Sequence, residues 1–347
     1  MQNKKCMFRL YSCVWEITLA CCFSCKYCGS KAGKARKNEL TTEECLSVAH
    51  QLAEIGCRRV SLIGGEVFMR PDWLQIVKAL TDRKIKVTVI TNGYLFSDKL
   101  LADIKSANIE SFAISLDGPQ NIHDAFRQTG SFQRAMDTID ILTQNYIPVS
   151  VISTLHSKNY KYLDEMYELL KTKKIFAWQI QACSPMGNAA EETFQTEIDF
   201  RYVIDFVGQH IHNPYFAVGA ADNIGYYTEK EGSLRGNTSG KAVFLGCGAG
   251  LDNIGIDSEG NVRGCEAMYD ESFIEGNLRN RSLYDIWNDP GAFSYNRQFT
   301  PEKLSGKCKD CEYGCKCAGG CRSYNYFATG KLYESPYCAR QSREKEI

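Results

Sequence analysis

Three cysteines follow an early apolar run, and their spacing limits what this part of the chain can bind. The run covers residues 14–19, and the cysteines are Cys21, Cys25 and Cys28 in the string CCFSCKYC. Each thiolate can ligate one iron of a four-iron, four-sulfur cubane. A loop with three such ligands leaves the fourth iron open to a substrate or a cofactor.

Two other interpretations of this segment are open. Cys22 gives a second register, Cys22-x2-Cys25-x2-Cys28, which is typical of ferredoxins; that motif would continue with Cys-Pro, whereas Gly29 and Ser30 follow here. A structural zinc site usually takes four ligands in paired C-x2-C knuckles. A single triplet does not supply four ligands, so the sequence favours the cluster.

Size and charge exclude several classes of protein. The chain has 347 residues, enough for a barrel-sized domain and a smaller one, and 41 basic residues balance 41 acidic residues, which argues against nucleic-acid binding. No apolar stretch reaches the roughly 18 residues of a membrane span, and no secretion signal is recognisable, so we expect a cytoplasmic protein. Seventeen cysteines in such a chain indicate metal or redox chemistry.

Strand-like and helix-like segments alternate over the first half of the chain. The expected strands are 14–19, 60–63, 86–91, 111–116, 149–154 and 177–182, and the expected helices are 42–55, 71–80, 97–106, 132–142 and 160–170. Alternation of this kind predicts parallel strands covered by helices. The predicted fold class is α/β, a partial (β/α)6 TIM-like barrel, with a doubly wound open sheet as the alternative.

The chain divides into three predicted regions. Residues 1–182 form the partial barrel, and 183–245 form a bridging region with one helix at 200–210. Residues 246–347 form a small, irregular, cysteine-rich domain with little regular structure.

Polar and glycine-containing motifs follow the carboxyl ends of the predicted strands, where active sites of parallel α/β barrels lie. These residues are Gly64, Gly65 and Glu66 after the second strand, Asn92 after the third, Ser115, Asp117 and Arg127 at or after the fourth, and Met186 after the sixth. A glycine-rich turn is common by itself, and Met186 lies in a segment that also suits an ordinary Pro-Gly turn.

The cysteine triplet, the GGE motif and the strings ISLDGP and HDAFR together resemble the radical S-adenosylmethionine (SAM) superfamily. In that family the open iron chelates the amino and carboxylate groups of SAM, and SAM is cleaved to methionine and a 5′-deoxyadenosyl radical. The resemblance implies that Gly64, Gly65 and Glu66 hold the amino group of SAM. It assigns the SAM carboxylate to Ser115 and Arg127, whose guanidinium suits a carboxylate.

The resemblance also implies that Asn92, Asp117 and Met186 belong to the SAM site. The loop that contains Met186 touches the adenine in relatives, and Asp117 has the alternative role of a turn residue.

The C-terminal cysteines form a second pattern, Cys247-x12-Gly260-x4-Cys265, then Cys308-x2-Cys311-x5-Cys317-x3-Cys321, and Cys338 after sixteen more residues. This resembles the SPASM extension of radical SAM enzymes and implies two auxiliary clusters, hence three [4Fe–4S] clusters in all. Cys308, Cys311, Cys317 and Cys338 would hold the distal cluster. Cys247, Cys265 and Cys321 would hold the proximal one, with Cys315 or an open iron in the fourth position; zinc is the alternative.

Cys183 ends the sixth predicted strand, and we expect it to face the cavity as a hydrogen-atom donor to a substrate radical. The remaining cysteines are expected to be mostly buried apolar side chains. They are Cys6, Cys13, Cys22, Cys45 and Cys57.

The resemblance implies an oxidoreductase of the peptide-maturase group, which forms a cross-link or thioether in a ribosomally made peptide. Alternatives are formylglycine formation as in sulfatase maturases, peptide epimerisation, tetrapyrrole side-chain modification, and an electron carrier without catalysis. About thirteen residues precede the first predicted strand, too few for a leader-binding domain, so leader binding would need a separate leader-binding protein or another surface, or the substrate has no leader. The expected reductant is of the flavodoxin or ferredoxin type.

Overall fold

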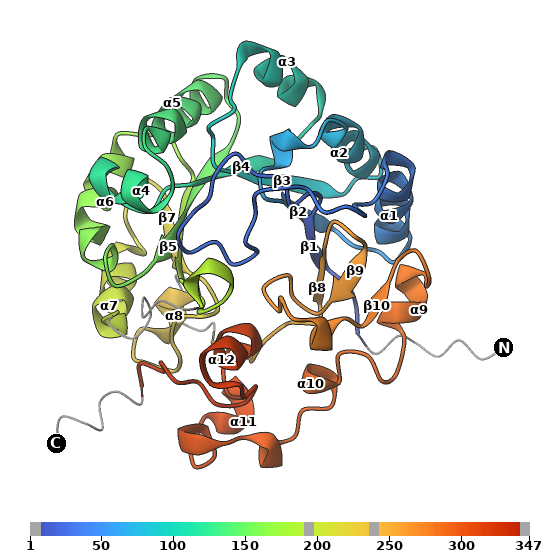
Figure 1. Cartoon of the computed structure of the whole chain (residues 1–347). Helices are drawn as coiled ribbons and strands as arrows, with labels where there is room; N and C mark the ends of the chain where they lie inside the picture. The colour runs from blue at the N-terminus through green and yellow to red at the C-terminus, as the bar shows by residue number, and fades with distance from the viewer. Residues whose placement is uncertain (1–7, 191–197, 236–242, 341–347) are drawn as a thin grey trace.

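A computed structural model describes residues 8–190, 198–235 and 243–340 of the chain. Its strands form one curved sheet, and helices α1 to α7 lie outside it (Figure 1). The strands are β1 (Ser12–Glu16), β2 (Arg59–Ile63), β3 (Lys86–Thr91), β4 (Ser111–Ser115), β5 (Val149–Leu155), β6 (Ala177–Ala182), β7 (Ala217–Ala220), β8 (Asn253–Ile256), β9 (Asn261–Arg263) and β10 (Gly276–Asn277).

The strand order identifies a partial barrel. Strands β1 to β6 each pair in parallel with the next strand along the chain, without the reversal of order that defines a doubly wound sheet. Strand β8 returns to pair in parallel with β1. Eight parallel strands therefore follow the cyclic order of a barrel, and among the described strands β7 and β8 are not paired with each other. The predicted partial barrel is confirmed, with β7 and β8 as parallel strands that the sequence did not predict.

Six helices, α1, α2, α3, α5, α6 and α7, begin and end close to where the sequence placed them, whereas α4 and α8 to α12 were not predicted. The helices are α1 (Thr42–Glu54), α2 (Trp73–Thr81), α3 (Asp98–Ser106), α4 (Gln120–Phe126), α5 (Ser131–Gln144), α6 (Leu163–Lys171), α7 (Phe200–His210), α8 (Glu231–Leu234), α9 (Leu283–Trp287), α10 (Ser294–Arg297), α11 (Gly314–Cys317) and α12 (Arg322–Thr329). Helix α1 starts at a capping box in which Thr41 and Glu44 each accept a hydrogen bond from the other's backbone N–H.

Alternation along the strands separates the core from the interior of the barrel. In β3, Val87 and Val89 are fully buried, whereas Thr88 and Ile90 are only partly buried. Successive side chains of a strand point to opposite faces, so one set packs beneath the helices and the other faces the interior. Trp15 and Trp178 are among the largest fully buried side chains of the core.

The first strand differs from its prediction. The apolar run at 14–19 suggested a strand over those residues, but β1 covers Ser12–Glu16. The carboxylate of Glu16 is buried, and it accepts a hydrogen bond from Arg36 at 2.5 Å. The backbone of Thr18 then accepts a hydrogen bond from Gly65, which directs residues 17–20 across the end of β2.

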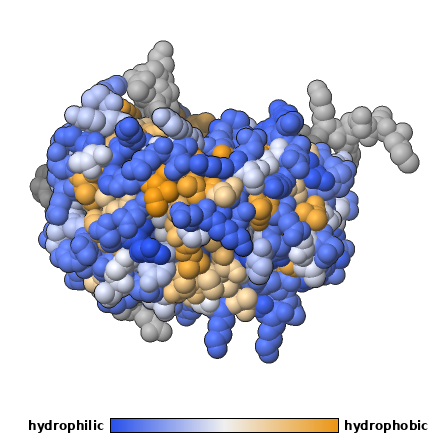
Figure 2. All heavy atoms as spheres, turned by 90° about the horizontal axis from the view of Figure 1, so that it is seen from above, coloured by the Kyte–Doolittle hydropathy of each residue, from blue (hydrophilic) through white to orange (hydrophobic). Residues whose placement is uncertain are grey.

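The C-terminal region extends the sheet before it becomes irregular. Strand β9 pairs antiparallel with β8, and β10 pairs antiparallel with β9, so this region adds an edge beside β1. Short helices α9 to α12 follow, in the lower part of Figure 1. Figure 2 shows that hydrophilic side chains dominate the face seen there, with a smaller hydrophobic area near its centre.

The remaining cysteines differ in how far they are buried. Cys13, Cys45 and Cys57 are buried as predicted, Cys22 is only partly buried, and Cys6 lies outside the described residues. None of the helices in the described part of the chain is long and apolar enough to cross a membrane.

Candidate active site

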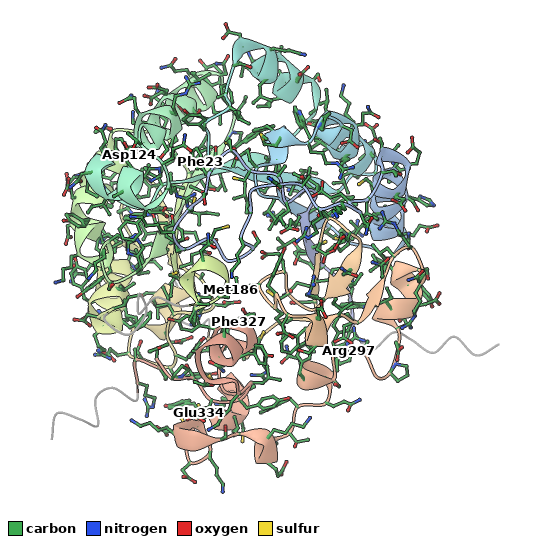
Figure 3. The ribbon with its side chains drawn as sticks, in the orientation of Figure 1. Phe23, Asp124, Met186, Arg297, Phe327 and Glu334 are labelled. Carbon is green, nitrogen blue, oxygen red and sulfur yellow. The ribbon has the colours of Figure 1, made fainter. Side chains whose placement is uncertain are left out.

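A cavity of about 580 Å³ lies at the carboxyl ends of the parallel strands. This volume falls in the range of small-molecule and cofactor sites. Figure 3 labels two of its lining residues, Phe23 on the loop after β1 and Met186 on the loop after β6. The sequence-predicted residues in its lining are Cys21, Cys25, Cys28, Gly64, Gly65, Asn92, Ser115, Arg127, Cys183 and Met186.

The loop that carries the cysteine triplet is held by backbone hydrogen bonds. Backbone N–H groups point at two of the sulfur atoms, from Phe23 to Cys21 Sγ at 3.4 Å and from Ala32 to Cys28 Sγ at 3.3 Å. N–H groups directed at sulfur stabilise a thiolate and tune the potential of an iron–sulfur cluster.

The loop after β6 packs directly on the cysteine loop. The side-chain amide of Asn188 donates to the carbonyl of Cys25 at 2.8 Å, and its backbone N–H donates to the carbonyl of Cys28 at 2.9 Å. Gly187 lies so close that a Cβ there would stand 2.2 Å from the Cys28 carbonyl oxygen. Contacts between residues more than 150 positions apart thus fix the position of the triplet.

Gly64 and Gly65 are glycines because the cysteine loop crosses over them. A Cβ on Gly65 would lie 2.3 Å from the carbonyl oxygen of Ala20, and a Cβ on Gly64 would lie 2.8 Å from that of Thr18. Real Cβ atoms do not approach a backbone this closely, so both glycines are required by the close approach. The backbone at the end of β2 therefore faces the cavity without side chains to cover it.

Glu66 points toward the end of β3 and is absent from the described lining of the cavity. Its buried carboxylate accepts hydrogen bonds from the Thr91 hydroxyl at 2.7 Å and from the Asn92 backbone at 2.9 Å. Burial raises the pKa of Glu66 above its ordinary value, although these hydrogen bonds oppose the rise. In this position Glu66 orders the Asn92 turn, and Asn92 itself lines the cavity.

Asp117 likewise supports other residues from beneath the cavity wall. Its buried carboxylate accepts hydrogen bonds from Arg127 Nε, from the Tyr27 hydroxyl and, at 2.8 Å, from the Thr154 backbone. Burial alone would raise the pKa of Asp117, but the charge and hydrogen bond of Arg127 hold it below its ordinary value. The pair fixes the Arg127 guanidinium in the cavity wall, near Ser115 in the lining.

Cys183 is buried at the end of β6 and contributes to the cavity lining. It packs in a small apolar cluster with Tyr27 and Ala189, next to Phe126. Tyr27 immediately precedes Cys28, so Cys183 belongs to the same wall as the cysteine triplet.

The predicted distal ligands come together around one small cavity, and the predicted proximal ones lie close enough to interact electrostatically with one another. Four cysteines, Cys308, Cys311, Cys317 and Cys338, line one small cavity that aromatic side chains also enclose. Cys247, Cys265 and Cys321 are partly buried against the main core. Cys315, the suggested additional ligand, is exposed.

The donor chemistry of both cysteine groups fits iron–sulfur clusters. Thiolates are the ordinary ligands of such clusters, and each ligand binds a different iron. A single zinc ion needs all its ligands on one atom. Within the described ranges, no three His, Cys, Asp or Glu side chains converge closely enough to hold one metal ion. The cysteine thiolates therefore suit a cluster, in which each binds its own iron.

Sequence reasoning missed several polar residues of the cavity. Gln179 and Gln181 project from β6, Asn223 follows β7, and Glu266 directly follows Cys265. Burial and the negative charge of Glu16 raise the pKa of Glu266 to about 7. The alternation of polar residues along β6 was a usable signal for the glutamines. Nothing in the sequence indicated that Glu266 reaches the barrel.

Comparisons with known proteins agree with this architecture. A family model described as the radical SAM superfamily matches residues 15–170, and one described as an iron–sulfur cluster-binding domain, SPASM, matches residues 247–312. The AdoMet-dependent heme synthase of Methanosarcina barkeri is 29% identical over 95% of this chain and 97% of its own length. The mycofactocin maturase MftC of Mycobacterium ulcerans is 27% identical over 93% of this chain and 85% of its own length.

Solved structures show the same fold at low sequence identity. SuiB of Streptococcus suis bound to precursor peptide SuiA has a TM-score of 0.75 at 19% identity, over 94% of this chain and 74% of SuiB. Native anSMEcpe with bound AdoMet has a TM-score of 0.70 at 16% identity, over 96% of this chain and 95% of that chain.

The two matched domains imply iron–sulfur clusters and SAM as cofactors, and the two matches together span more than half of the chain. The protein is an enzyme of the radical SAM type. It belongs to the radical SAM superfamily and carries a SPASM domain.

Proposed function

We propose that this enzyme oxidatively modifies a peptide, with a cross-link or thioether as the product. The main observation behind this proposal is the composition of the cavity, whose lining contains the cysteine triplet together with the neutral amide side chains of Gln179 and Gln181. Amides donate and accept hydrogen bonds and so match peptide groups. A peptide substrate is supported by the maturase MftC and by the peptide-bound SuiB structure. It is also supported by the sporulation killing factor maturation protein SkfB of Bacillus subtilis, which is 29% identical over 56% of this chain.

The residues of the SAM site are part of this proposal. Cys21, Cys25 and Cys28 hold the first cluster. When bound, the cluster and SAM supply a 5′-deoxyadenosyl radical that removes a hydrogen atom from the substrate. The bare backbone at Gly64 and Gly65 offers polar groups to SAM, because no side chain covers it.

Arg127 is the cation of this wall and suits the SAM carboxylate. Ser115 and Met186 also line the site, for the SAM carboxylate and adenine respectively. Asp117 and Glu66 support the residues that contact SAM: Asp117 orients Arg127, and Glu66 holds the turn at Asn92.

Two auxiliary clusters complete the proposed cofactor set of three. The enclosed group of four cysteines leaves no ligand position for a substrate, which suits a role in electron transfer. The overall reaction removes two hydrogens from the peptide: one leaves as a hydrogen atom to the 5′-deoxyadenosyl radical, and the other as a proton released to solvent together with one electron. An electron acceptor is therefore required, and these clusters provide it.

For the epimerisation alternative, Cys183 is proposed as the hydrogen-atom donor within the cavity. Such a donor is needed for an epimerisation, in which the substrate radical regains hydrogen, but not for a cross-link. A Cys183→Ser variant that still forms the full product would remove this role, whereas accumulation of unquenched or by-product species would support it.

The reductant is proposed to be an acidic protein of the flavodoxin or ferredoxin type. Lys26, Lys31, Lys34 and Lys37 are exposed on and just after the cysteine loop. A group of like charges steers an oppositely charged partner to that place, and the effect weakens as salt increases. Whether a separate leader-binding protein takes part is tested by pull-down with the unmodified precursor.

Tetrapyrrole modification is the second candidate. Heme synthases from three organisms, including Methanosarcina barkeri, are 28–29% identical and align over 95% of this chain. Formylglycine formation remains an alternative, because anSMEcpe structures with bound Cys-containing peptides share the fold.

The test is anaerobic turnover of the reconstituted, reduced enzyme with SAM and each peptide encoded beside its gene. The proposal predicts 5′-deoxyadenosine together with a peptide lighter by two hydrogens. With a peptide deuterated at the reacting carbon, deuterium should appear in 5′-deoxyadenosine. Turnover of a porphyrin in place of every peptide would contradict the proposal, as would the absence of 5′-deoxyadenosine.

A further inference from the structure

The charges of the cavity wall are unevenly balanced. Among the described lining residues, the one basic side chain is Arg127 and the one carboxylic acid side chain is Glu266. Arg127 is neutralised by its ion pair with the buried Asp117. Glu266 forms no hydrogen bond or ion pair with its carboxylate within the parts of the chain that the structure describes. Glu266 is therefore the acidic side chain of the described lining that has no charged partner.

The neighbours of Glu266 do not supply the missing positive charge. The two charged groups that act on it are Glu16 and Arg263. Arg263 is already paired with Asp257 at 2.8 Å, and Glu16 adds negative charge. A partly buried carboxylate in such surroundings gains from any cation that approaches it.

Glu266 stands at the break in the sheet. Its backbone packs on β8, where a Cβ on Gly255 would lie 2.3 Å from the Glu266 nitrogen, so the glycine leaves room for it. On the other side of the break, Asn223 follows β7. The Asn223 side chain is used in two hydrogen bonds to the backbone of Ala182, at 3.1 and 2.8 Å. Of these two polar residues, only Glu266 is available to a ligand.

The β6 wall adds neutral polar groups. Gln179 is exposed within the barrel, and Gln181 donates a hydrogen bond to Thr154 at 3.0 Å. A molecule that enters the cavity thus meets amides on β6 and a single carboxylate beside β8. Such a wall attracts a basic group and repels a molecule with several carboxylates.

We propose that Glu266 selects the substrate by charge, because it binds the ammonium or guanidinium of a basic side chain next to the residue that reacts. This inference rests on the proposed peptide function and specifies its substrate class. It places the substrate selection in the SPASM part of the chain, since Glu266 directly follows Cys265. It also disfavours tetrapyrroles, whose carboxylates would lie against Glu266.

The test measures binding without turnover. Reconstituted enzyme with SAM is titrated calorimetrically with acetylated, amidated Gly-Gly-X-Gly-Gly, where X is Lys, Gln or Glu, and with coproporphyrin as a tetracarboxylate probe. The wild type is expected to bind the Lys peptide about tenfold more tightly than the Glu peptide, which is the effect of one favourable charge pair. Glu266→Gln should abolish this preference, and Glu266→Lys should reverse it and strengthen coproporphyrin binding.

Glu271→Lys is the matched control, because this substitution makes the same charge change at an exposed position five residues away. Its preference should equal that of the wild type. Equal affinities for the Lys and Glu peptides in the wild type, or no measurable binding of the Lys peptide, would overturn the inference. A preference that persists in Glu266→Gln would overturn it as well.

Two features keep this test independent of other failures. Glu266→Gln conserves shape, so it remains informative if the Lys variant does not fold, and iron content and circular dichroism report on folding. The affinities are measured without reductant, so a failure of the proposed peptide chemistry would appear in the 5′-deoxyadenosine assay and not here.

Discussion

The two cysteine groups lie in opposite kinds of surroundings. Cys21, Cys25 and Cys28 face a cavity of about 580 Å³ whose walls carry both polar and apolar side chains. The four cysteines from Cys308 to Cys338 surround a small cavity whose lining includes Tyr226, Tyr227 and Tyr313. Three ligands before an open cavity leave room for a further ligand, whereas four ligands in an enclosed one do not. From this difference we infer SAM chemistry at the first group and electron transfer at the second.

The largest expected effect comes from removing a ligand of the open group. Cys25→Ala should reduce 5′-deoxyadenosine formation to the level of the enzyme-free blank, because the cluster that cleaves SAM loses one of its three protein ligands. The variant should lose about four of about twelve irons and keep those of the C-terminal domain. Retained SAM cleavage would show that Cys25 is not a ligand and would end the comparison.

The enclosed group should behave differently. Cys338→Ala should lose about four irons and the modified peptide, yet continue to cleave SAM, since the first cluster stays intact. Cys315→Ala is the matched control, because Cys315 lies on α11 beside the proposed ligand Cys317 but is exposed. Iron analysis and chromatography of 5′-deoxyadenosine measure both effects. Equal iron loss in the two variants would make Cys315 a ligand.

A smaller effect is expected from the ion pair beneath the cavity. Arg127→Ala leaves the buried Asp117 carboxylate without its partner, which should reduce the free energy of unfolding by about 3–5 kcal/mol. Arg127→Lys should recover part of this stability but little of the SAM affinity, because an ammonium lacks the planar fork of the guanidinium. Chemical denaturation and SAM titration separate the two results; full SAM affinity in Arg127→Lys would contradict the carboxylate assignment.

The smallest effect concerns the crossing of the cysteine loop over β2. Gly65→Ala should reduce the free energy of unfolding by about 1–3 kcal/mol, because the new Cβ overlaps the backbone of Leu19 and Ala20. SAM binding should weaken along with it. Gly33 lies on the cysteine loop itself, and a Cβ there would have no atom within 4 Å. Gly33→Ala should therefore match the wild type in thermal unfolding and SAM titration. Equal behaviour of the two variants would remove the steric role of Gly65.

Sequence patterns predicted the barrel well where strands are long and regular. Strands β3 and β6 were predicted at their observed bounds, because each combines apolar residues with flanking turn signals. Strands β7 and β8 were missed since Ala217–Ala220 and Asn253–Ile256 have four residues each and contain glycine. Pairing with β6 and β1 makes them strands, and no local pattern reports that pairing.

The candidate site was predictable only in part, for a similar reason. Spacing in the sequence pointed to the cysteines, because ligands in one loop lie close together in the chain. The hydrogen bonds of Asn188 to the cysteine loop and the position of Glu266 in the barrel join distant segments. Glu66 and Asp117 were assigned to SAM contacts, and only the fold reveals that their carboxylates point into the supporting structure.

The most direct test of the account is electron paramagnetic resonance of the reduced enzyme with and without SAM, in a variant whose C-terminal cysteines are replaced. An open iron at the Cys21, Cys25 and Cys28 cluster predicts that SAM changes the g-values of the signal, and that 17O in the SAM carboxylate broadens it. A spectrum unaffected by SAM would contradict the account, because the fourth position would then be closed to the cofactor.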